Sequence, residues 1–398
     1  MSRRGREAVV FACLDADTLG GVQRVTHTVA QGLAERGREV HVIGLHRAES
    51  PFRYVEHPRY TTHVIHRTPV GRLSRPGRRR ERRTLERLLR DVGPGFAVLA
   101  SPSVVTRIRR LLPERLLPIG QYHGSYEHAR GSWHLRSVRG HYGSLEKAVF
   151  LSEEDAWLFS EHALLPNTWS IPNPLPVWPS RTAELSARRV LGIGRLGGVK
   201  RFDRLISAFA EACGGTGGGT FPGANLPADG RPEGPGDRAD RGERERAGEG
   251  WELHLIGEGP ELDRLRSHAA ACEVSDRVVF RGPVPAALMG REYLGGSVLA
   301  LSSEHEGLPL VVGEAASYGI PAVAFDVSCG LRSLVLDGRT GLLVPPSDVS
   351  ALATALAGLM ASAAERRRLG AAARAHVETF RPDLVLDRWE TLFEEITR

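Results

Sequence analysis

The chain has 398 residues, 41% of them hydrophobic, and a chain of this length usually divides into two domains with separate hydrophobic cores. It has no run near the roughly 18 apolar residues of a membrane-spanning helix, and its first residues lack the apolar stretch of a signal peptide, so the sequence predicts a cytoplasmic protein. The 53 Lys and Arg residues exceed the 47 Asp and Glu residues only modestly, but the excess is unevenly placed along the chain.

Short apolar, β-branched runs alternate with longer amphipathic segments, which is typical of a parallel sheet flanked by helices. In the first half, strands are predicted at 8–14, 40–45, 96–100, 117–121 and 148–152. In the second half, they are predicted at 189–194, 252–257, 278–280, 298–301, 322–325 and 342–344. This order predicts an α/β chain with two Rossmann-like domains in tandem and an active site in a cleft at the carboxyl ends of their strands.

The boundary between the domains is predicted at a proline-rich connection, 171–185, which we interpret as a hinge for domain closure. It separates an N-terminal domain, 1–178, from a C-terminal domain, 186–379. The last residues, about 380–398, have the apolar spacing of one more amphipathic helix.

Two features of the first domain lie where predicted strands end. Gly20 and Gly21 close the first strand-to-helix turn, where the absence of a Cβ lets backbone N–H groups approach a ligand. His123 follows the strand at 117–121, at the edge where an open α/β sheet binds ligands. An ordinary turn and a core or surface histidine are the alternatives.

The segment from Arg72 to Arg90 holds nine arginines against Glu81 and Glu86, a local excess of seven positive charges. One interpretation is a solvated helix face. The other is contact with an anionic membrane surface or an anionic polymer, because each basic residue near such a surface contributes about 1 kcal/mol. Membrane contact would make the protein peripheral at the inner face of the membrane. Nucleic acid is not an expected partner, since no aromatic residues interleave with the arginines.

Arg195 and Lys200 directly follow the first predicted strand of the second domain. A forked guanidinium and a mobile ammonium are the pair expected to hold two phosphates and to stabilise negative charge on a departing nucleoside diphosphate. A pair of surface cations is the alternative interpretation.

Residues 214–250 interrupt the alternation of strands and helices. They contain twelve glycines, several prolines and mixed charges, with almost no apolar periodicity. Such a composition cannot bury enough surface to offset the entropy lost on ordering. We interpret this segment as a disordered insertion at the periphery of the second domain.

Glu306 and Glu314, separated by seven residues, stand between an apolar strand and an alanine-rich helix. Pro309 suits the first turn of that helix, because its missing N–H would have no partner there. Glu306 then lies in the preceding loop, where free backbone N–H groups and the positive end of the helix dipole can receive a diphosphate. Glu314, more than one turn into the helix, can accept hydrogen bonds from vicinal ribose hydroxyls. The stretch indicates a nucleotide-sugar site, and two ordinary solvated acids are the alternative.

Neither a metal nor a cofactor is expected. The four cysteines, Cys13, Cys213, Cys272 and Cys329, are far apart and form no CxxC pair, so they are interpreted as reduced structural thiols. The sequence has no HExxH motif and no DxD-like acidic pair in a plausible loop.

Five segments, in their order and spacing, resemble glycosyltransferase family 4, whose members are retaining nucleotide-sugar enzymes with the GT-B fold. They are 20–25 with the strand at 40–43, 194–196 with 200–203, 255–260, 302–307 running into 314–315, and 330–344. The match covers most of the chain. Many relatives have an aromatic residue where Leu308 stands and a proline where Leu331 stands, and these departures leave the donor sugar open.

The resemblance implies two Rossmann-like domains facing each other across a cleft, with the C-terminal helix packing back on the first domain. It implies catalytic roles for four residues: Arg195, Lys200, Glu306 and His123. It implies donor-binding roles for seven: Gly20, Gly21, Gly282, Val284, Gly307, Leu308 and Glu314. His123 and Glu306 would face the donor sugar, and Ser302 and Glu304 would shape the loop. Since retaining enzymes of this fold are thought to react on the front face of the sugar, Glu306 is assigned to donor positioning and transition-state stabilisation rather than to nucleophilic attack.

The function implied is metal-independent, retaining transfer of a hexose from a nucleotide sugar, with UDP expected as the nucleotide. The acceptor would be a glycan, a lipid-linked sugar or a polyol phosphate, as in the bacterial transferases that build capsule, exopolysaccharide or wall teichoic acid. A nucleotide-sugar 2-epimerase would need further acid/base residues that the sequence does not reveal. A non-catalytic nucleotide-sugar-binding partner of another transferase is disfavoured, because all four charged residues of the motifs are intact.

Overall fold

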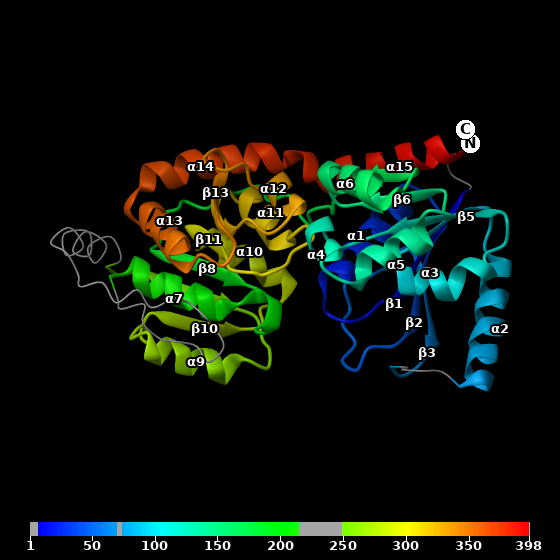
Figure 1. Cartoon of the computed structure of the whole chain (residues 1–398), viewed down its shortest axis with the longest axis horizontal. Coiled ribbons are helices and arrows are strands. Elements are labelled where there is room, and N and C mark those ends of the chain that lie inside the picture. The colour runs from blue at the N-terminus through cyan, green and yellow to red at the C-terminus, as the bar shows by residue number, and fades with distance from the viewer. Residues whose placement is uncertain (1–6, 70–73, 215–248, 398) are drawn as a thin grey trace. The chain divides into compact units, whose positions relative to one another are not determined.

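The computed structural model describes residues 7–69, 74–214 and 249–397 (Figure 1). The chain divides into two compact units. The first comprises Met1–Trp178, Ser328–Gly330 and Thr379–Arg398, and the second comprises Pro179–Val327 and Leu331–Glu378. The predicted insertion at 214–250 lies almost entirely outside the described residues.

The first unit is built on a seven-stranded parallel sheet in the order β3-β2-β1-β4-β5-β6-β7. Its strands are β1 (Ala8–Asp15), β2 (Val40–His46), β3 (Thr61–His66), β4 (Gly95–Leu99), β5 (Leu116–Gln121), β6 (Lys147–Phe150) and β7 (Thr168–Ser170). All five strands predicted for this half are present. The two that were not predicted, β3 and β7, lie at the two edges of the sheet, where a strand is partly exposed and has no continuous apolar run.

Helices cover both faces of this sheet (Figure 1). The helices of this unit are α1 (Gly21–Glu35), α2 (Arg75–Asp91), α3 (Pro102–Ile108), η2 (Arg109–Leu111), α4 (Tyr126–Arg130), α5 (Trp133–Tyr142), α6 (Glu153–Ala163) and α15 (Pro382–Thr397), the last preceded by η4 (Val377–Phe380). One face packs on α2 to α6 through a single apolar core. Burial on both faces explains why the central strands are almost continuously apolar.

The C-terminal helix α15 packs with α1 on the other face of the first sheet. The ring of Trp389 meets Phe11 edge-on with ring centroids 6.2 Å apart, and Phe393 stacks on Phe96 with centroids 4.3 Å apart. Because all four rings are buried, the last helix is part of the hydrophobic core of the first unit.

The second unit has a six-stranded parallel sheet in the order β10-β9-β8-β11-β12-β13. Its strands are β8 (Arg189–Ile193), β9 (Glu252–Ile256), β10 (Val278–Gly282), β11 (Val298–Leu301), β12 (Ala322–Phe325) and β13 (Gly341–Val344), so all six strands predicted for this half are confirmed. Its helices are η3 (Gly198–Lys200), α7 (Phe202–Ala212), α9 (Leu262–Ala271), α10 (Ala286–Leu294), α11 (Leu310–Ser317), α13 (Val349–Ala361) and α14 (Ala363–His376). Helix α12 (Cys329–Leu334) begins in the first unit and continues into the second from Leu331. Helices α7, α9, α13 and α14 share one core with the sheet.

The strand order of this sheet reverses direction at one point, between β8 and β11. From β8 the chain continues to β9 and β10 on one side, and then returns to place β11, β12 and β13 on the other side. Where the order reverses, the loops after two neighbouring parallel strands diverge and leave a crevice outside their carboxyl ends. In this unit the strand order reverses between β8 and β11, so the loops after these two strands are the ones to consider.

No helix in the described ranges is both long enough and apolar enough to cross a bilayer.

Candidate active site

The turn after β8 carries Arg195 and Lys200, and it is packed directly against the loop after β9. A Cβ on Gly257 would lie 2.0 Å from the carbonyl oxygen of Gly194, and one on Gly259 would lie 2.2 Å from that of Leu196. The N–H of Leu196 also donates to the carbonyl of Glu258 at 2.9 Å. The two glycines therefore serve close backbone packing, which fixes the turn that presents the cations.

Lys200 and Glu306 form an ion pair, with 2.6 Å between Nζ and Oε1. Lys200 ends the short helix η3 after β8, and Glu306 lies in the loop after β11, so the pair stands at the point where the strand order reverses. Both side chains are largely buried. An anionic ligand that reaches this point would meet the ammonium already oriented by a carboxylate.

Arg195 lies on the same turn as Lys200 and is exposed to solvent. Its carbonyl accepts from the N–H of Gly197 at 2.9 Å, which fixes the backbone of the turn, while its guanidinium makes no hydrogen bond or ion pair within the described residues. The structure thus places two cations on one turn, one held by a carboxylate and one open to solvent.

Glu314 is buried, with 5% of its surface exposed, so its interpretation as an ordinary solvated acid is wrong. It lies in α11, which begins at Leu310. Pro309 was expected in the first turn of this helix, but it is the residue just before the helix, because its backbone is extended instead of helical. Oε2 of Glu314 accepts a hydrogen bond of 2.6 Å from the hydroxyl of Tyr293, whose ring stacks on Tyr318 with centroids 5.1 Å apart. Tyr293 therefore orients the carboxylate, and sequence analysis missed it because it stands in no motif.

The remaining donor-binding candidates of the second unit lie at the same edge of its sheet. Gly282 is the last residue of β10 instead of following it, with φ of +70°, and it accepts the N–H of Gly257 at 2.9 Å. Val284 is half-buried in the loop that follows. In the loop after β11, Gly307 is half-buried, whereas the side chain of Leu308 points into the interior, so only its backbone can face a ligand.

His123, in the first unit, lies two residues beyond the end of β5. Burial lowers the pKa of its ring to about 4, and Nε2 is buried without a hydrogen-bond partner among the residues that the structure describes. At neutral pH the ring is therefore neutral, so it can exchange a hydrogen bond with a hydroxyl but cannot supply a positive charge to a phosphate.

Gly20 and Gly21 occupy the turn after β1, and the N–H of Gly20 already has a partner within the protein. The N–H of Gly20 donates to the hydroxyl of Tyr54 at 2.7 Å, and this hydroxyl donates to the carbonyl of Thr18 at 2.6 Å. Gly21 opens α1, where the first N–H groups have no partner within the helix. Tyr54, which carries no motif signal, thus closes the turn and uses the Gly20 amide that the sequence analysis assigned to a ligand.

One group of side chains in the described part of the first unit has the geometry to hold a metal ion, namely Glu127, Asp155 and Cys329. Its members already have other tasks. Asp155 accepts from the hydroxyl of Ser152 and the N–H of Tyr126, and the Cys329 thiol donates to Glu127 at 3.0 Å. Because burial and these acids raise the pKa of Cys329, the thiol stays protonated, which does not fit a metal ligand.

Two open parallel sheets in one chain, each wound in both directions from a central strand, define the GT-B class of fold. A family model described as glycosyl transferases group 1 matches residues 243–376, and one described as Glycosyltransferase Family 4 matches residues 19–176. Since one model matches each half and together they span most of the chain, the chain belongs to the GT-B glycosyltransferases.

The chain is similar to an exopolysaccharide phosphotransferase of Streptomyces coelicolor, with 27% identity over 98% of this chain, and it spans 41% of the length of that relative. Among solved structures, a sucrose-phosphate synthase from Thermosynechococcus elongatus has a TM-score of 0.77 at 18% identity, covering 98% of this chain and 99% of the other. HepE of Anabaena in complex with UDP-glucose has a TM-score of 0.72 at 15% identity, covering 97% of this chain and 99% of the other. Both likenesses support the two-sheet fold.

Proposed function

We propose that this glycosyltransferase is a retaining, metal-independent enzyme of family 4 that moves a hexose from a UDP-sugar to an acceptor in the synthesis of a cell-surface polysaccharide. The observation that carries the proposal is the Lys200–Glu306 ion pair at the reversal point of the second sheet. The likeness to a UDP-glucose-bound structure supports the donor, and the likeness to an exopolysaccharide enzyme supports the pathway class.

In this proposal, the two cations on the turn after β8 provide the main electrostatic stabilisation of the transition state. When the bond between the anomeric carbon and the β-phosphate oxygen breaks, negative charge accumulates on the departing diphosphate. The ammonium of Lys200 and the guanidinium of Arg195 would stabilise this charge in the transition state more than in the bound donor. Their positive charge is the reason for proposing that no metal ion is needed.

The two glutamates have separate tasks in this proposal. Glu314, oriented by Tyr293, accepts hydrogen bonds from the ribose hydroxyls, while the backbone of Gly282 and Val284 faces the base. Glu306 and the backbone at Gly307 and Leu308 position the sugar. The acceptor hydroxyl then attacks from the face that the diphosphate leaves, and a phosphate oxygen takes its proton, so the anomeric configuration is retained.

Calorimetric titration with UDP, GDP and ADP, followed by transfer assays with the matching sugar nucleotides, tests the proposal. We expect UDP to bind most tightly and the product to retain the configuration of the donor, with unchanged rates in the presence of a chelator. Binding without transfer across a broad panel would favour a non-catalytic partner, and conversion of the donor sugar alone would favour an epimerase. An inverted product would overturn the retaining assignment.

His123→Ala is expected to lower kcat/KM for the UDP-sugar by about tenfold, because a neutral ring that positions a sugar hydroxyl contributes about one hydrogen bond. The affinity for UDP should not change, since UDP has no sugar for His123 to contact. His141→Ala, which removes a ring bonded to the Ser137 carbonyl on α5, is the control. Unchanged kinetics in the His123 variant would return this residue to a structural role.

The exposed arginines of α2 are the basis for a proposal about where the acceptor is found. Leu85 and Leu89 face the core, whereas Arg79, Arg83 and Arg87, spaced four residues apart along one stripe, are exposed. We assign this stripe to an anionic lipid surface, where a lipid-linked acceptor would reside. Arg72, at the start of the predicted basic segment, lies outside the described residues.

Replacing Arg79, Arg83 and Arg87 together with glutamine should weaken binding to vesicles of anionic lipid by about a hundredfold, at about 1 kcal/mol for each charge. Transfer to a short soluble acceptor should not change. Vesicle sedimentation at low and high salt measures the effect, because screening should mimic the substitutions. Binding of an anionic polymer but not of vesicles would assign the stripe to a polyanionic acceptor instead.

A further inference from the structure

Arg201 has a backbone conformation that is unusual for a residue with a Cβ. It lies between η3 and α7 with φ of +46° and ψ of 48°, in the left-handed region that favours glycine. A non-glycine residue stays in this region only when its surroundings hold it there. Its side chain shows what holds it.

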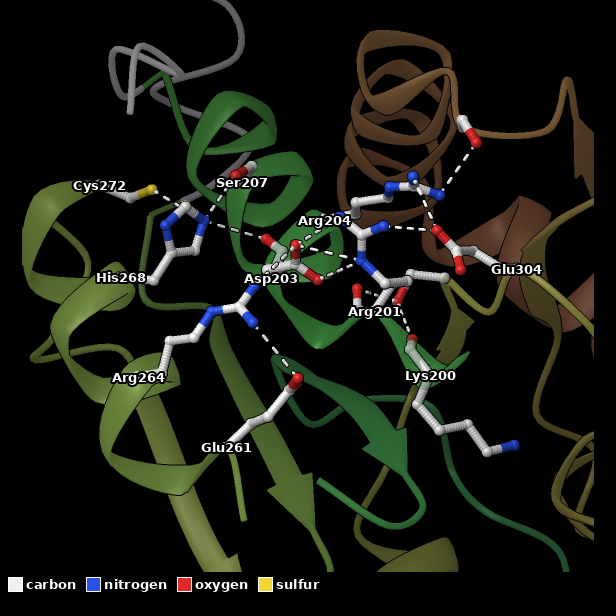
Figure 2. Close-up of polar contacts among 12 residues, drawn as sticks. Lys200, Arg201, Asp203, Arg204, Ser207, Glu261, Arg264, His268, Cys272 and Glu304 are labelled. Carbon is white, nitrogen blue, oxygen red and sulfur yellow. Dashed lines mark hydrogen bonds and ion pairs between the residues drawn. The ribbon is translucent and has the colours of Figure 1, made fainter. Parts of the chain in front are cut away.

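The Arg201 guanidinium joins two segments that are about a hundred residues apart in the sequence (Figure 2). On its own segment, Nε and Nη2 donate to the two carboxylate oxygens of Asp203 at 3.0 and 2.8 Å. Toward the loop after β11, Nη1 donates to Glu304, which also accepts from Arg204 at 3.1 Å. These hydrogen bonds, those to Asp203 foremost, raise the pKa of Arg201, and they hold the pKa of Asp203 low although burial acts to raise it.

Backbone contacts run beside this bridge. The N–H of Glu304 donates to the carbonyl of Val199 at 2.8 Å, and the Ser302 hydroxyl lies 2.9 and 2.8 Å from the carbonyl oxygens of Lys200 and Arg201. The turn after β8 and the loop after β11 are therefore one connected piece, and Lys200 and Glu306 project from its two halves.

We infer that Arg201 is a positioning residue, whose bridge to Glu304 holds the Lys200 ammonium against Glu306 and presents it to the departing diphosphate. In Figure 2 the Lys200 side chain extends away from the Arg201 network, so Arg201 would act on Lys200 through the backbone of the turn. The catalytic part of this inference rests on the proposed function. The geometric part does not, because it concerns only the Lys200–Glu306 pair.

The network has a different purpose from simple stabilisation. Exchange of a partly buried ion pair for apolar groups is often neutral, so such pairs are weak evidence for stability, whereas a cation displaced by a fraction of its contact distance loses much of its effect on a reaction. Strain at φ of +46° would be relieved by glycine, yet the chain has arginine there. Both facts agree with a side chain that sets geometry.

The test compares Arg201→Gly with Glu304→Ala, the double variant and Arg264→Ala. Glycine relieves the backbone strain while it removes the bridge, so the fold should survive, and Glu304→Ala removes the acceptor of the same bridge at a half-exposed side chain. Arg264 contacts Asp203 at 3.7 Å and Glu261 but is not bonded to Glu304, which makes it the control. We expect kcat to fall about tenfold in either bridge variant with little change in KM, no further loss in the double variant, and a change within about twofold for Arg264→Ala.

A second measurement is independent of catalysis. The chain has only two lysines, Lys147 and Lys200, so mild amine labelling followed by mass spectrometry reads the exposure of Lys200 against an internal reference. Bridge variants should label faster at Lys200 but not at Lys147. Faster labelling in a protein that transfers no sugar would uphold the positioning and overturn the proposed function. Wild-type kinetics and labelling in both bridge variants would overturn the inference itself, as would losses that add fully in the double variant.

Discussion

Lys200→Ala is expected to lower kcat by at least about two orders of magnitude, which is the loss typical when one preorganised group that stabilises transition-state charge is removed. The chain offers a reason to regard this lysine as specific. Of its 53 cationic side chains only two are lysines, so arginine is its general cation and Lys200 is an exception at the reversal point of the second sheet. A compact ammonium can pair with Glu306 and a phosphate at once, whereas a planar guanidinium imposes its own geometry.

The measurement is single-turnover transfer with a saturating UDP-sugar, which separates the chemical step from donor binding. Lys200→Arg keeps the charge and should restore only part of the rate. Lys147→Ala is the matched control, because Lys147 lies in β6 of the first unit, where its ammonium contacts the ring of Trp169. A purified, folded Lys200→Ala protein with wild-type turnover would remove Lys200 from the site.

Glu314→Ala is expected to weaken UDP binding by about ten- to a hundredfold, because hydrogen bonds to a charged acceptor contribute about 1.5–3 kcal/mol. Tyr293→Phe should weaken it less, by about fivefold, since the carboxylate stays and only its orientation is released. The order of the two effects follows from the 2.6 Å hydrogen bond between Tyr293 and Glu314. Calorimetry on the two variants and on Glu365→Ala, a half-exposed glutamate of the same unit that pairs with Arg368, provides the comparison.

A double variant separates binding from folding in this experiment. If Tyr293 acts only through Glu314, adding Tyr293→Phe to Glu314→Ala should cause no further loss of UDP affinity, although both changes can lower the melting temperature. Equal UDP affinity in wild type and Glu314→Ala would mean that the ribose is not bound at α11, and the donor site would then have to be sought elsewhere on the second unit.

The sequence predicted the central strands of both sheets because they are buried on both faces and therefore read as continuous apolar runs. It failed at β3 and β7, which are edge strands with mixed polarity. It placed Arg195, Lys200, Glu306 and Glu314 beyond strand ends, where the structure has them. This was possible because the apolar periodicity that marks strands and helices can be recognised within short stretches of sequence. Their roles toward a donor remain proposals.

The sequence by itself determined which residues could carry charge to a ligand and at which strand ends they would lie, since these properties depend on residue type and on short-range pattern. Only the tertiary structure decided how they meet: that Lys200 pairs with Glu306, that Tyr293 orients Glu314, that Tyr54 uses the amide of Gly20, and that Arg201 joins Asp203 to Glu304. Except for Arg201 and Asp203, these partners come from different segments of the chain. They meet because parallel strands that are distant in sequence become neighbours in a sheet, and a one-dimensional pattern does not contain that adjacency.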